Sequence, residues 1–176
     1  MKAYRVHEYG DAAKLIEDEV NKPSAKQGHV VVEVKASSLN PIDHKLLKSD
    51  LGINPALPGI LHMDVSGVIT EVGEGVTDFK TGDEIYGCAG GLQGEAGNIE
   101  GALADFMLAD SNLIALKPKS LSFSESAALP LVTITAWEGL FDRAHIKKED
   151  HVLIHGGTGG VGHIAIQLAR QHGARV

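Results

Sequence analysis

The sequence predicts a mixed β and α/β fold, in which a mostly antiparallel β domain precedes the first part of a parallel α/β domain. Three observations carry this prediction. Short apolar runs separated by Gly, Pro, Asn and Asp fill residues 2–118, a pattern typical of antiparallel strands. The apolar spacing becomes helical from Ser120 onward. Residues 151–170 then join an apolar run to a second helical pattern through a cluster of glycines.

The β domain is expected to span residues 1–119. Its clearest strand is Val30–Lys35, a valine-rich run of alternating polarity. Further strands are expected at residues 65–72, 82–86, 102–108 and 113–116. Glycine turns such as Gly73–Gly75 separate these runs, and Pro118 ends the series because proline cannot donate a hydrogen bond to a strand ladder.

Residues 120–150 are expected to form a bridging helix followed by a polar connector. Ser122 and Glu125 have the Ser-x-x-Glu spacing of a capping box, which marks the start of a helix. Apolar residues continue at helical spacing as far as Phe141. Pro130 should interrupt or restart this helix, because a proline ring in a helix interior forces a kink. The polar run Arg143–Asp150 then leads into the next element.

The glycine cluster is the most informative motif of the chain. His151–His155 is interpreted as a short buried strand, and glycines at 157, 159 and 162 follow it as Gly-x-Gly-x-x-Gly. In this motif the first glycine permits a tight turn, the second lets a pyrophosphate approach the backbone, and the third lets helix and strand pack closely. Free N–H groups at the helix start then hold the phosphates. The expected dinucleotide-binding residues are Gly157, Thr158, Gly159, Gly160, Val161 and Gly162.

The helix after these glycines is expected to end at Gly173, with a second strand beginning at residue 174. Its core-facing stripe comprises Val161, Ile164, Ala165, Leu168 and Ala169. A dinucleotide-binding half needs three parallel strands and two crossover helices. The sequence stops at Val176, so residues 151–176 are expected to be the truncated start of such a domain. A flexible glycine turn is the alternative interpretation.

Composition excludes several classes of protein. The balance of 16 basic against 23 acidic residues gives a net charge of −7, which argues against nucleic acid or an anionic membrane as the main partner. The single cysteine, Cys88, excludes an internal disulfide and a four-cysteine zinc cluster. No window approaches about 18 uninterrupted apolar residues, and the N-terminus has no apolar signal core. A cytoplasmic protein is expected.

Four stretches carry a family resemblance, namely residues 38–43, residues 63–69 with 71–76, residues 81–86, and residues 129–137. In this order and spacing they resemble the N-terminal half of a medium-chain dehydrogenase/reductase, and more narrowly its zinc-free quinone oxidoreductase branch. The resemblance implies a GroES-like β domain and a Rossmann domain with the nicotinamide in the cleft between them. It also implies hydride transfer from NADPH to a quinone or an α,β-unsaturated carbonyl, and a homodimeric full-length protein.

The resemblance also bears on zinc. Zinc alcohol dehydrogenases of this superfamily use a cysteine, a histidine and a further cysteine or acid around an open position. At the matching positions this sequence has Asn40, Met63 and Leu131, none of which suits zinc, so no metal is expected. A zinc enzyme with unusual ligands is the alternative. It would have to recruit His62, which lies one residue from the matching position and so on the opposite face of a strand.

Asn40 and Thr135 are the expected catalytic residues, and both are also expected to contact the cofactor. The resemblance places the Asn40 amide beside the nicotinamide, where it can bind either substrate or cofactor. The alternative is that Asn40 only shapes a turn and a helix cap. The Thr135 hydroxyl matches a nicotinamide contact, whereas a bond to the carbonyl one turn earlier is its alternative. Asp43 and His44 are expected as a solvated helix start.

The cofactor is expected to be NADPH from the resemblance alone. NAD is not excluded, because the residue that distinguishes the two lies about 20 residues beyond the glycine motif. With half of that site missing, the 176-residue chain alone is expected to be inactive, and a non-catalytic fragment is the alternative function. Many relatives carry a tyrosine where this chain has Leu51. The change makes the pocket more apolar and leaves quinones and enones equally open as substrates.

Overall fold

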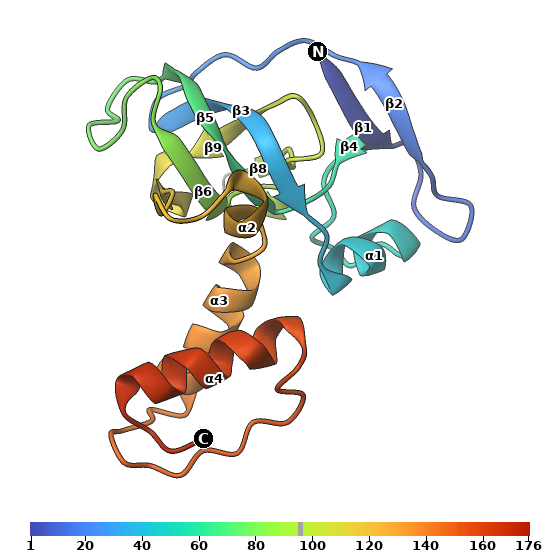
Figure 1. The fold of residues 1–176 in the computed structure, drawn as a ribbon. Coiled ribbons are helices and arrows are strands. Elements are labelled where there is room, and N and C mark those ends of the chain that lie inside the picture. Colours follow the sequence, from blue (N-terminus) through green and yellow to red (C-terminus); the bar gives the residue numbers. More distant parts are fainter. Residues whose placement is uncertain (95–96) are drawn as a thin grey trace. The chain divides into compact units, whose positions relative to one another are not determined.

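A computed structural model describes residues 1–94 and 97–176. The chain divides into two compact units, Met1–Ala128 and Leu129–Val176. The first unit contains all the named strands, and the second contains the helical segments from Pro130 to His172, labelled α3 and α4 in Figure 1. No helix in the described part of the chain is both long and apolar enough to cross a membrane.

An antiparallel five-stranded sheet forms the body of the first unit, with the strand order β10-β6-β5-β3-β9. Its strands are β3 His29–Ser38, β5 Asp64–Val72, β6 Glu84–Cys88, β9 Phe106–Asp110 and β10 Ile114–Leu116. The strands expected at residues 30–35, 65–72, 82–86 and 113–116 fall on or overlap these elements. Valine-rich β3 lies between β5 and β9, where its branched side chains pack well on a pleated surface.

The strand expected at residues 102–108 is displaced toward the C-terminus. The ladder with β3 begins only at Phe106. The preceding residues instead bond to a different segment, since the N–H groups of Ala102 and Leu103 donate to the carbonyls of His62 and Leu61 at 2.8 and 3.2 Å. This long-range pairing holds the chain close to residues 60–62 and so brings that segment into the unit's interior.

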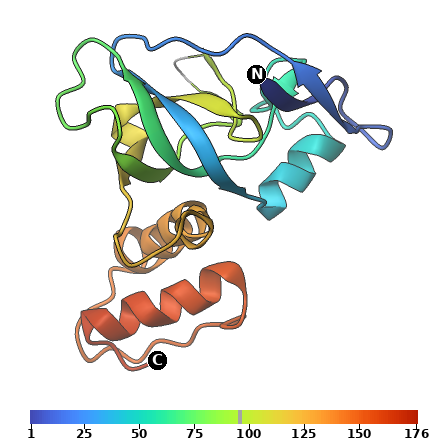
Figure 2. The same cartoon turned by 45° about the horizontal axis from the view of Figure 1, so that its top comes forward.

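Two smaller sheets complete the first unit. Strands β1 Lys2–Val6, β2 Leu15–Glu19 and β4 Gly59–Ile60 pair in the order β2-β1-β4, and β7 Leu92–Gly94 pairs with β8 Gly97–Ile99. Figure 2, in which the top of the first view comes forward, shows β1 and β2 in blue. The core of the unit lies on the five-stranded sheet and is made by Val30, Val32, Val65, Ile69, Ile85, Ala89, Ala102, Met107, Ala109 and Ile114.

Short helices connect the strands of the first unit. Helix α1, Pro41–Lys48, follows β3 directly, with Asn40 as its N-cap residue. A 3-10 turn, Ser111–Leu113, separates β9 from β10. Helix α2, Phe123–Ala127, begins with the expected capping box, in which the Glu125 N–H donates to Ser122 Oγ at 3.2 Å and the Ser122 N–H donates to Glu125. Helix α2 packs on β3, β5 and β6.

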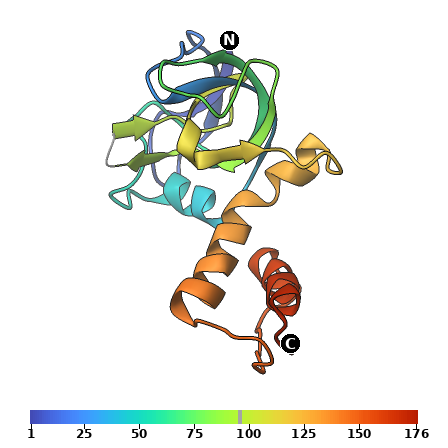
Figure 3. The ribbon, with the colours of Figure 1, turned by 90° about the vertical axis from the view of Figure 1, so that its left-hand side faces the viewer.

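The second unit pairs two helical segments. Helix α3, Pro130–Trp137, has Pro130 in its first turn and continues as a π-helical turn, Glu138–Arg143. The predicted restart at Pro130 is therefore confirmed. Helix α4, Gly160–His172, ends at Gly173, whose φ of 101° is left-handed. Helices α3 and α4 pack on one another, as Figure 3 also shows, around a small core of Ala136, Leu140, Ala165, Ala169 and Ala174.

The buried strand expected at residues 151–155 is not formed beyond one bridge at His151, and His155 already belongs to the glycine turn. His151 pairs in parallel with Arg175, through bonds of 2.8 Å from the Val152 N–H to the Arg175 carbonyl and from the Arg175 N–H to the Asp150 carbonyl. The side chain of Leu153 is 81% exposed. The single bridge and the exposure of Leu153 have the same cause, because residues 174–176 are the segment that pairs here and they offer only a short partner. The parallel direction is that of a βαβ unit.

Candidate functional site

Asn40 lies at the junction of β3 and α1, and two aspartates hold its polar groups. Its backbone N–H donates to Asp43 Oδ2 at 2.7 Å, and its side-chain Nδ2 donates to Asp64 Oδ2 at 2.8 Å. The Ser38 hydroxyl donates to the same Asp64 oxygen at 2.9 Å. Asn40, Asp43 and Asp64 are only 6%, 2% and 0% exposed. The sequence-predicted asparagine is thus a fixed side chain in a buried polar cluster.

The expectation of a solvated pair at residues 43 and 44 is wrong for Asp43. Its carboxylate is buried and accepts hydrogen bonds from two segments that are distant in sequence, the backbone N–H of Asn40 and that of His62 at 3.1 Å. A carboxylate in the first turn of a helix is well placed to accept such free N–H groups. Asp43 therefore ties the start of α1 to residue 62, whereas His44 is exposed as expected.

His62 has an unusual backbone for a non-glycine residue, with φ at 70°. Its ring is half-buried, and Nδ1 lies 3.0 Å from Ser37 Oγ. Burial lowers the pKa of His62, while the Asp43 and Asp64 carboxylates act in the opposite direction. Met63, the next residue, is buried at 4% exposure. Among the described residues no group of three or more His, Cys, Asp and Glu side chains is placed to hold a metal ion.

Cys88 is the neighbour of Asp64 on the adjacent strand, since the two residues are paired in the β5–β6 register. Burial, followed by the charge of Asp64 and a hydrogen bond to it, raises the pKa of the Cys88 thiol to about 12. A thiol of this kind stays protonated at neutral pH, which is the opposite of what a nucleophilic cysteine requires. Cys88 is therefore a member of the buried polar cluster and not a reactive group.

The glycine turn of the second unit ends in an uncapped helix. Gly159 is the N-cap residue of α4, and it supplies no side-chain acceptor to the first turn. Gly159 donates its N–H to the Gly156 carbonyl at 2.9 Å, and the helical bonding then begins with the His163 N–H and the Gly159 carbonyl at 3.1 Å. The N–H groups of the first turn have no acceptor within a helix. They form a ready site for an anion.

Each glycine of the motif has its own environment. A Cβ on Gly162 would overlap the Gly156 carbonyl, and one on Gly157 would lie 2.8 Å from the Ile166 side chain. A Cβ on Gly159 would lie 3.3 Å from the Gly156 carbonyl oxygen, and beyond the two adjacent residues no other described atom lies within 4 Å of it. The close packing expected at the third glycine and the open space expected at the second are therefore present. The cofactor contacts of Gly157, Thr158, Gly159, Gly160, Val161 and Gly162 stay a prediction.

The tight turn lies one residue earlier than expected. Gly156, and not Gly157, has a left-handed φ of 71°, a conformation that glycine adopts without strain. Sequence reasoning missed it because two consecutive glycines fit the turn equally well. Val161 also departs from the expected core stripe and is 37% exposed. Gly160 faces α3 instead, because a Cβ there would lie 3.3 Å from the Val132 side chain. Val161, the next residue of α4, is therefore turned away from α3.

Thr135 projects from α3 with an exposed side chain. Its hydroxyl donates to the Leu131 carbonyl at 2.8 Å, which is the helical back-bond that sequence analysis gave as the alternative. Because the proton is already used, the Thr135 oxygen offers lone pairs to a ligand. Thr135 and the glycine turn belong to the second unit and Asn40 to the first.

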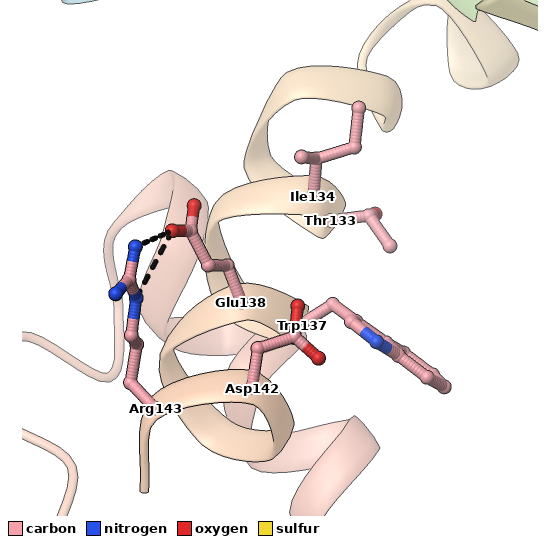
Figure 4. A pocket seen from close by; sticks show the side chains of 6 residues that line it. All are labelled: Thr133, Ile134, Trp137, Glu138, Asp142 and Arg143. Carbon is pink, nitrogen blue, oxygen red and sulfur yellow. Dashed lines mark hydrogen bonds and ion pairs between the residues drawn. The ribbon is translucent and has the colours of Figure 1, made fainter.

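Side chains of α3 and its π-helical turn line a surface hollow of about 600 Å³. The sequence did not predict this hollow. Figure 4 shows the six residues that line it, Thr133, Ile134, Trp137, Glu138, Asp142 and Arg143. Arg143 donates to Glu138 at 2.8 and 3.2 Å. Trp137 is 51% exposed, and its ring lies against that of Phe141 with 4.5 Å between the ring centroids.

Comparison with known proteins identifies related sequences. Residues 26–119 match the family described as the alcohol dehydrogenase GroES-like domain. The chain is 40% identical to 2-methylene-furan-3-one reductase of Solanum lycopersicum and 38% identical to the chloroplastic NADPH-dependent alkenal/one oxidoreductase of Arabidopsis thaliana, in each case over 97% of this chain and 44% of the relative. It is 34% identical to the quinone oxidoreductase of Rattus norvegicus, over 100% of this chain and 51% of the relative.

Solved structures also resemble this chain over its whole length. An alcohol dehydrogenase superfamily protein from Novosphingobium aromaticivorans superposes with a TM-score of 0.92 at 40% identity, covering 100% of this chain and 52% of that one. A mycobacterial protein solved in complex with NADPH superposes with a TM-score of 0.84 at 29% identity, again over 100% of this chain and 52% of that one. The chain thus spans about half the length of the curated relatives and solved structures that it matches.

Proposed function

Since the chain belongs to the alcohol dehydrogenase GroES-like family of the medium-chain dehydrogenase/reductase superfamily, we propose that the protein is a zinc-independent, NADPH-dependent oxidoreductase. In this proposal it transfers a hydride to a quinone or an α,β-unsaturated carbonyl. Relatives whose names specify quinone, alkenal/one or NADPH support both the reaction class and the cofactor. A cytoplasmic location and a homodimeric state of the complete protein belong to the same proposal.

The observation that carries the proposal is the uncapped N-terminus of α4 behind an open Gly159. The first-turn N–H groups and the positive end of the helix dipole favour a phosphate. The N-cap residue Gly159 offers them no side-chain acceptor, and the space beside its Cβ position allows a ligand to reach the backbone. The chain therefore fits the pyrophosphate of NADPH through backbone groups of Gly159, Gly160, Val161 and Gly162, with Gly157 and Thr158 in the turn beside them.

NADPH, when bound, supplies the hydride, and the chain's own side chains bind and orient the reacting groups. In the proposal Thr135 accepts a hydrogen bond from the nicotinamide end of the cofactor, because its own proton is used by the Leu131 carbonyl. Asn40 contributes a second fixed polar group. Holding two reactants in one orientation in a water-poor site supplies much of the rate acceleration in such reactions.

The residues at the expected zinc-ligand positions are poorly suited to bind zinc. Met63 is buried, and the Asn40 amide is engaged with Asp64, so neither residue is arranged as a zinc ligand. Leu51, 44% exposed, offers an apolar surface where a tyrosine hydroxyl would offer a proton. The proposal therefore requires no metal for turnover and gives enones and quinones the same standing as substrates.

The test is cofactor binding by the complete protein and by two glycine variants. Gly159→Ala should still fold, because the new Cβ needs only a small shift of the Gly156 carbonyl oxygen at 3.3 Å. It should bind NADPH at least about tenfold more weakly because the methyl group blocks the pyrophosphate. Gly139→Ala is the matched control, since outside its own helical turn no described atom lies within 4 Å of its Cβ position.

Binding is read from nicotinamide fluorescence, and turnover from NADPH oxidation with a simple quinone and a simple enone. Weaker binding by Gly159→Ala alone, together with oxidation by the wild type, would support the proposal. Equal NADPH affinity in all three proteins, or a wild type that oxidises NADPH with neither acceptor, would contradict it.

A further inference from the structure

His62 is held in a backbone conformation that is uncommon for any residue other than glycine. Its φ of 70° lies in the left-handed region. The His62 N–H donates to Asp43 Oδ1 at 3.1 Å, and its carbonyl accepts the Ala102 N–H at 2.8 Å. A Cβ on Gly91 or on Gly101 would stand 3.1 or 2.7 Å from the His62 carbonyl oxygen. The backbone of His62 is therefore covered, and a strained residue that its surroundings hold in place is typical of a functional position.

Ser37 sets which nitrogen of the His62 ring carries the proton. The Ser37 hydroxyl lies 3.0 Å from His62 Nδ1 and makes no other hydrogen bond in the described part of the chain. A hydroxyl has one proton to donate, so Ser37 donates it to Nδ1. Burial lowers the pKa of His62 despite the opposite effect of the Asp43 and Asp64 carboxylates, which keeps the ring neutral at pH 7. The neutral ring then carries its own proton on Nε2.

The Nε2 end of the ring is open to solvent. Among the described residues, the buried side-chain nitrogen and oxygen atoms that lack a hydrogen-bond partner are Arg5 Nε and Ser126 Oγ. His62 Nε2 also has no partner among these residues, so it cannot be buried. Since Nδ1 is engaged and the backbone is covered, the exposed part of this half-buried residue includes the Nε2 end. His62 thus presents an N–H donor at the surface of the buried polar cluster.

The other polar side chains of the cluster have already used their donors. The Asn40 NH2 group donates to Asp64 and Ser38, and the capping box of α1 engages the Asn40 side-chain oxygen with a backbone N–H. The Ser38 hydroxyl and the Cys88 thiol both donate to Asp64. The carboxylates of the cluster only accept at neutral pH. In the described part of this cluster, His62 is therefore the side chain that can donate a hydrogen bond to a ligand.

Resting on the proposed function, we propose that His62 is a catalytic residue whose Nε2–H donates a hydrogen bond to the carbonyl oxygen of the substrate. Asp43 accepts the backbone N–H groups of both His62 and Asn40, so this donor belongs to the site that the sequence predicts around Asn40. Ser37 is the positioning residue that fixes the tautomer. A quinone and an α,β-unsaturated carbonyl both offer the oxygen that this donor requires.

The donor acts where negative charge develops during the reaction. When the hydride and its electron pair form a C–H bond at the β-carbon of an enone, the C=C pair moves to the bond beside the carbonyl carbon. The C=O pair then moves onto oxygen, where the His62 N–H stabilises the charge. Water afterwards gives a proton to the α-carbon and leaves as hydroxide. His62 keeps its own proton throughout, as a neutral imidazole of lowered pKa can do.

The tautomer is tested by NMR, without any assay of activity. The chain contains nine histidines, and ¹⁵N-histidine labelling separates protonated from unprotonated ring nitrogens by their chemical shifts. The signals of His62 are those that disappear in His62→Gly. We expect the Nε2–H tautomer at neutral pH, and a mixture of both tautomers in Ser37→Ala. A His62 ring with its proton on Nδ1 in the wild type would overturn the proposal.

The catalytic role is tested in the complete protein. His62→Gly removes the ring, and glycine adopts the left-handed φ without strain. This variant should lower kcat for a simple enone about a hundredfold or more, the usual loss for one oxyanion donor, and should change the Kd for NADPH less than about threefold. His62→Asn tolerates the same φ and keeps an NH2 donor, so it should lose less. Added imidazole should restore part of the rate of His62→Gly.

His145→Gly is the matched control. His145 is also a left-handed histidine, with φ at 50°, but it lies exposed in the second unit, and its replacement should leave kcat unchanged. An equal loss of rate in both glycine variants would show a structural effect and overturn the proposal, as would a loss in His62→Gly that neither asparagine nor imidazole reduces. A His62→Gly variant that oxidises NADPH with the enone at the wild-type kcat would also overturn it, while leaving the proposed function intact.

Discussion

A Cβ on Gly162 would stand less than 3.0 Å from the carbonyl oxygen of Gly156. The two residues are six positions apart, and their contact is what joins the first turn of α4 to the glycine turn. The carbonyl belongs to backbone, so it cannot move aside as the end of a flexible side chain could.

Gly162→Ala is therefore expected to lower the free energy of unfolding by about 3 kcal/mol, the upper end of the range for overpacking. Gly139→Ala, with open space around it, should change stability by about 0.5 kcal/mol or less, in the stabilising direction. Denaturant unfolding followed by circular dichroism measures both. Equal stability of the two variants would show that the contact at Gly162 relaxes at little cost.

His62 should make the stability of the chain depend on pH. Its pKa is lowered in the folded protein, mainly by burial, so below the ordinary histidine value the unfolded state binds a proton that the folded state resists. The free energy of unfolding should therefore fall as pH is lowered from about 7 to 5. His62→Asn removes the titration but keeps a side chain that tolerates a positive φ, and its pH dependence should be shallower. Identical slopes for the two proteins would contradict this origin.

Cys88 should react very slowly with alkylating reagents. A thiol whose pKa is raised from 9.0 to about 12 has a thiolate fraction at pH 8 about a thousandfold below that of a free cysteine. Iodoacetamide labelling followed by intact mass should show little product in the native chain and rapid reaction in denaturant. Fast native labelling would place Cys88 in a different environment. Above about pH 9 the same shift should favour unfolding, because only the unfolded thiol ionises.

The capping box at α2 should contribute measurably to stability. Ser122 Oγ accepts the Glu125 N–H at 3.2 Å, and removal of such a cap costs about 1 kcal/mol. Ser122→Ala is expected to lower the free energy of unfolding by that amount. Ser120→Ala, two residues away and also exposed, is the control and should be neutral within about 0.5 kcal/mol. An equal effect of both changes would assign the loss to the segment and not to the cap.

Metal removal should leave turnover of the complete protein unchanged. The residues at the positions that hold zinc in relatives are Asn40, Met63 and Leu131, and their chemistry suits zinc poorly. Dialysis against a chelator, followed by elemental analysis and the NADPH oxidation assay, provides the check. Activity that disappears with the chelator and returns with zinc alone would refute the metal-free mechanism.

Local rules explain which features the sequence could predict. The capping pair Ser122 and Glu125, the helix restart at Pro130 and the end of α4 at Gly173 all depend on residues within one turn of each other. For these positions the identity of the residue nearly dictates the backbone. The tight glycine packing at residue 162 was predictable for the same reason, because the spacing of the motif encodes it.

Features that depend on distant contacts could not be predicted. Asp43 looked solvated at the start of a polar helix, yet His62, 19 positions away, places its N–H against the carboxylate. The ladder partner of β3 begins at Phe106 because residues 102 and 103 bond to residues 61 and 62. Leu153 looked buried by its apolar neighbours, but burial requires strands on both sides of the segment. In each case the missing information was which other segment lies alongside.

The unreactive Cys88 has a practical consequence for spectroscopy. It is the only cysteine of the chain, so the natural sequence already serves as a background without reactive thiols. A single cysteine introduced on an exposed residue of each unit could be coupled to a donor and an acceptor dye without first replacing Cys88. Energy transfer between the dyes, recorded with and without NADPH, would then report the distance between the two units in solution.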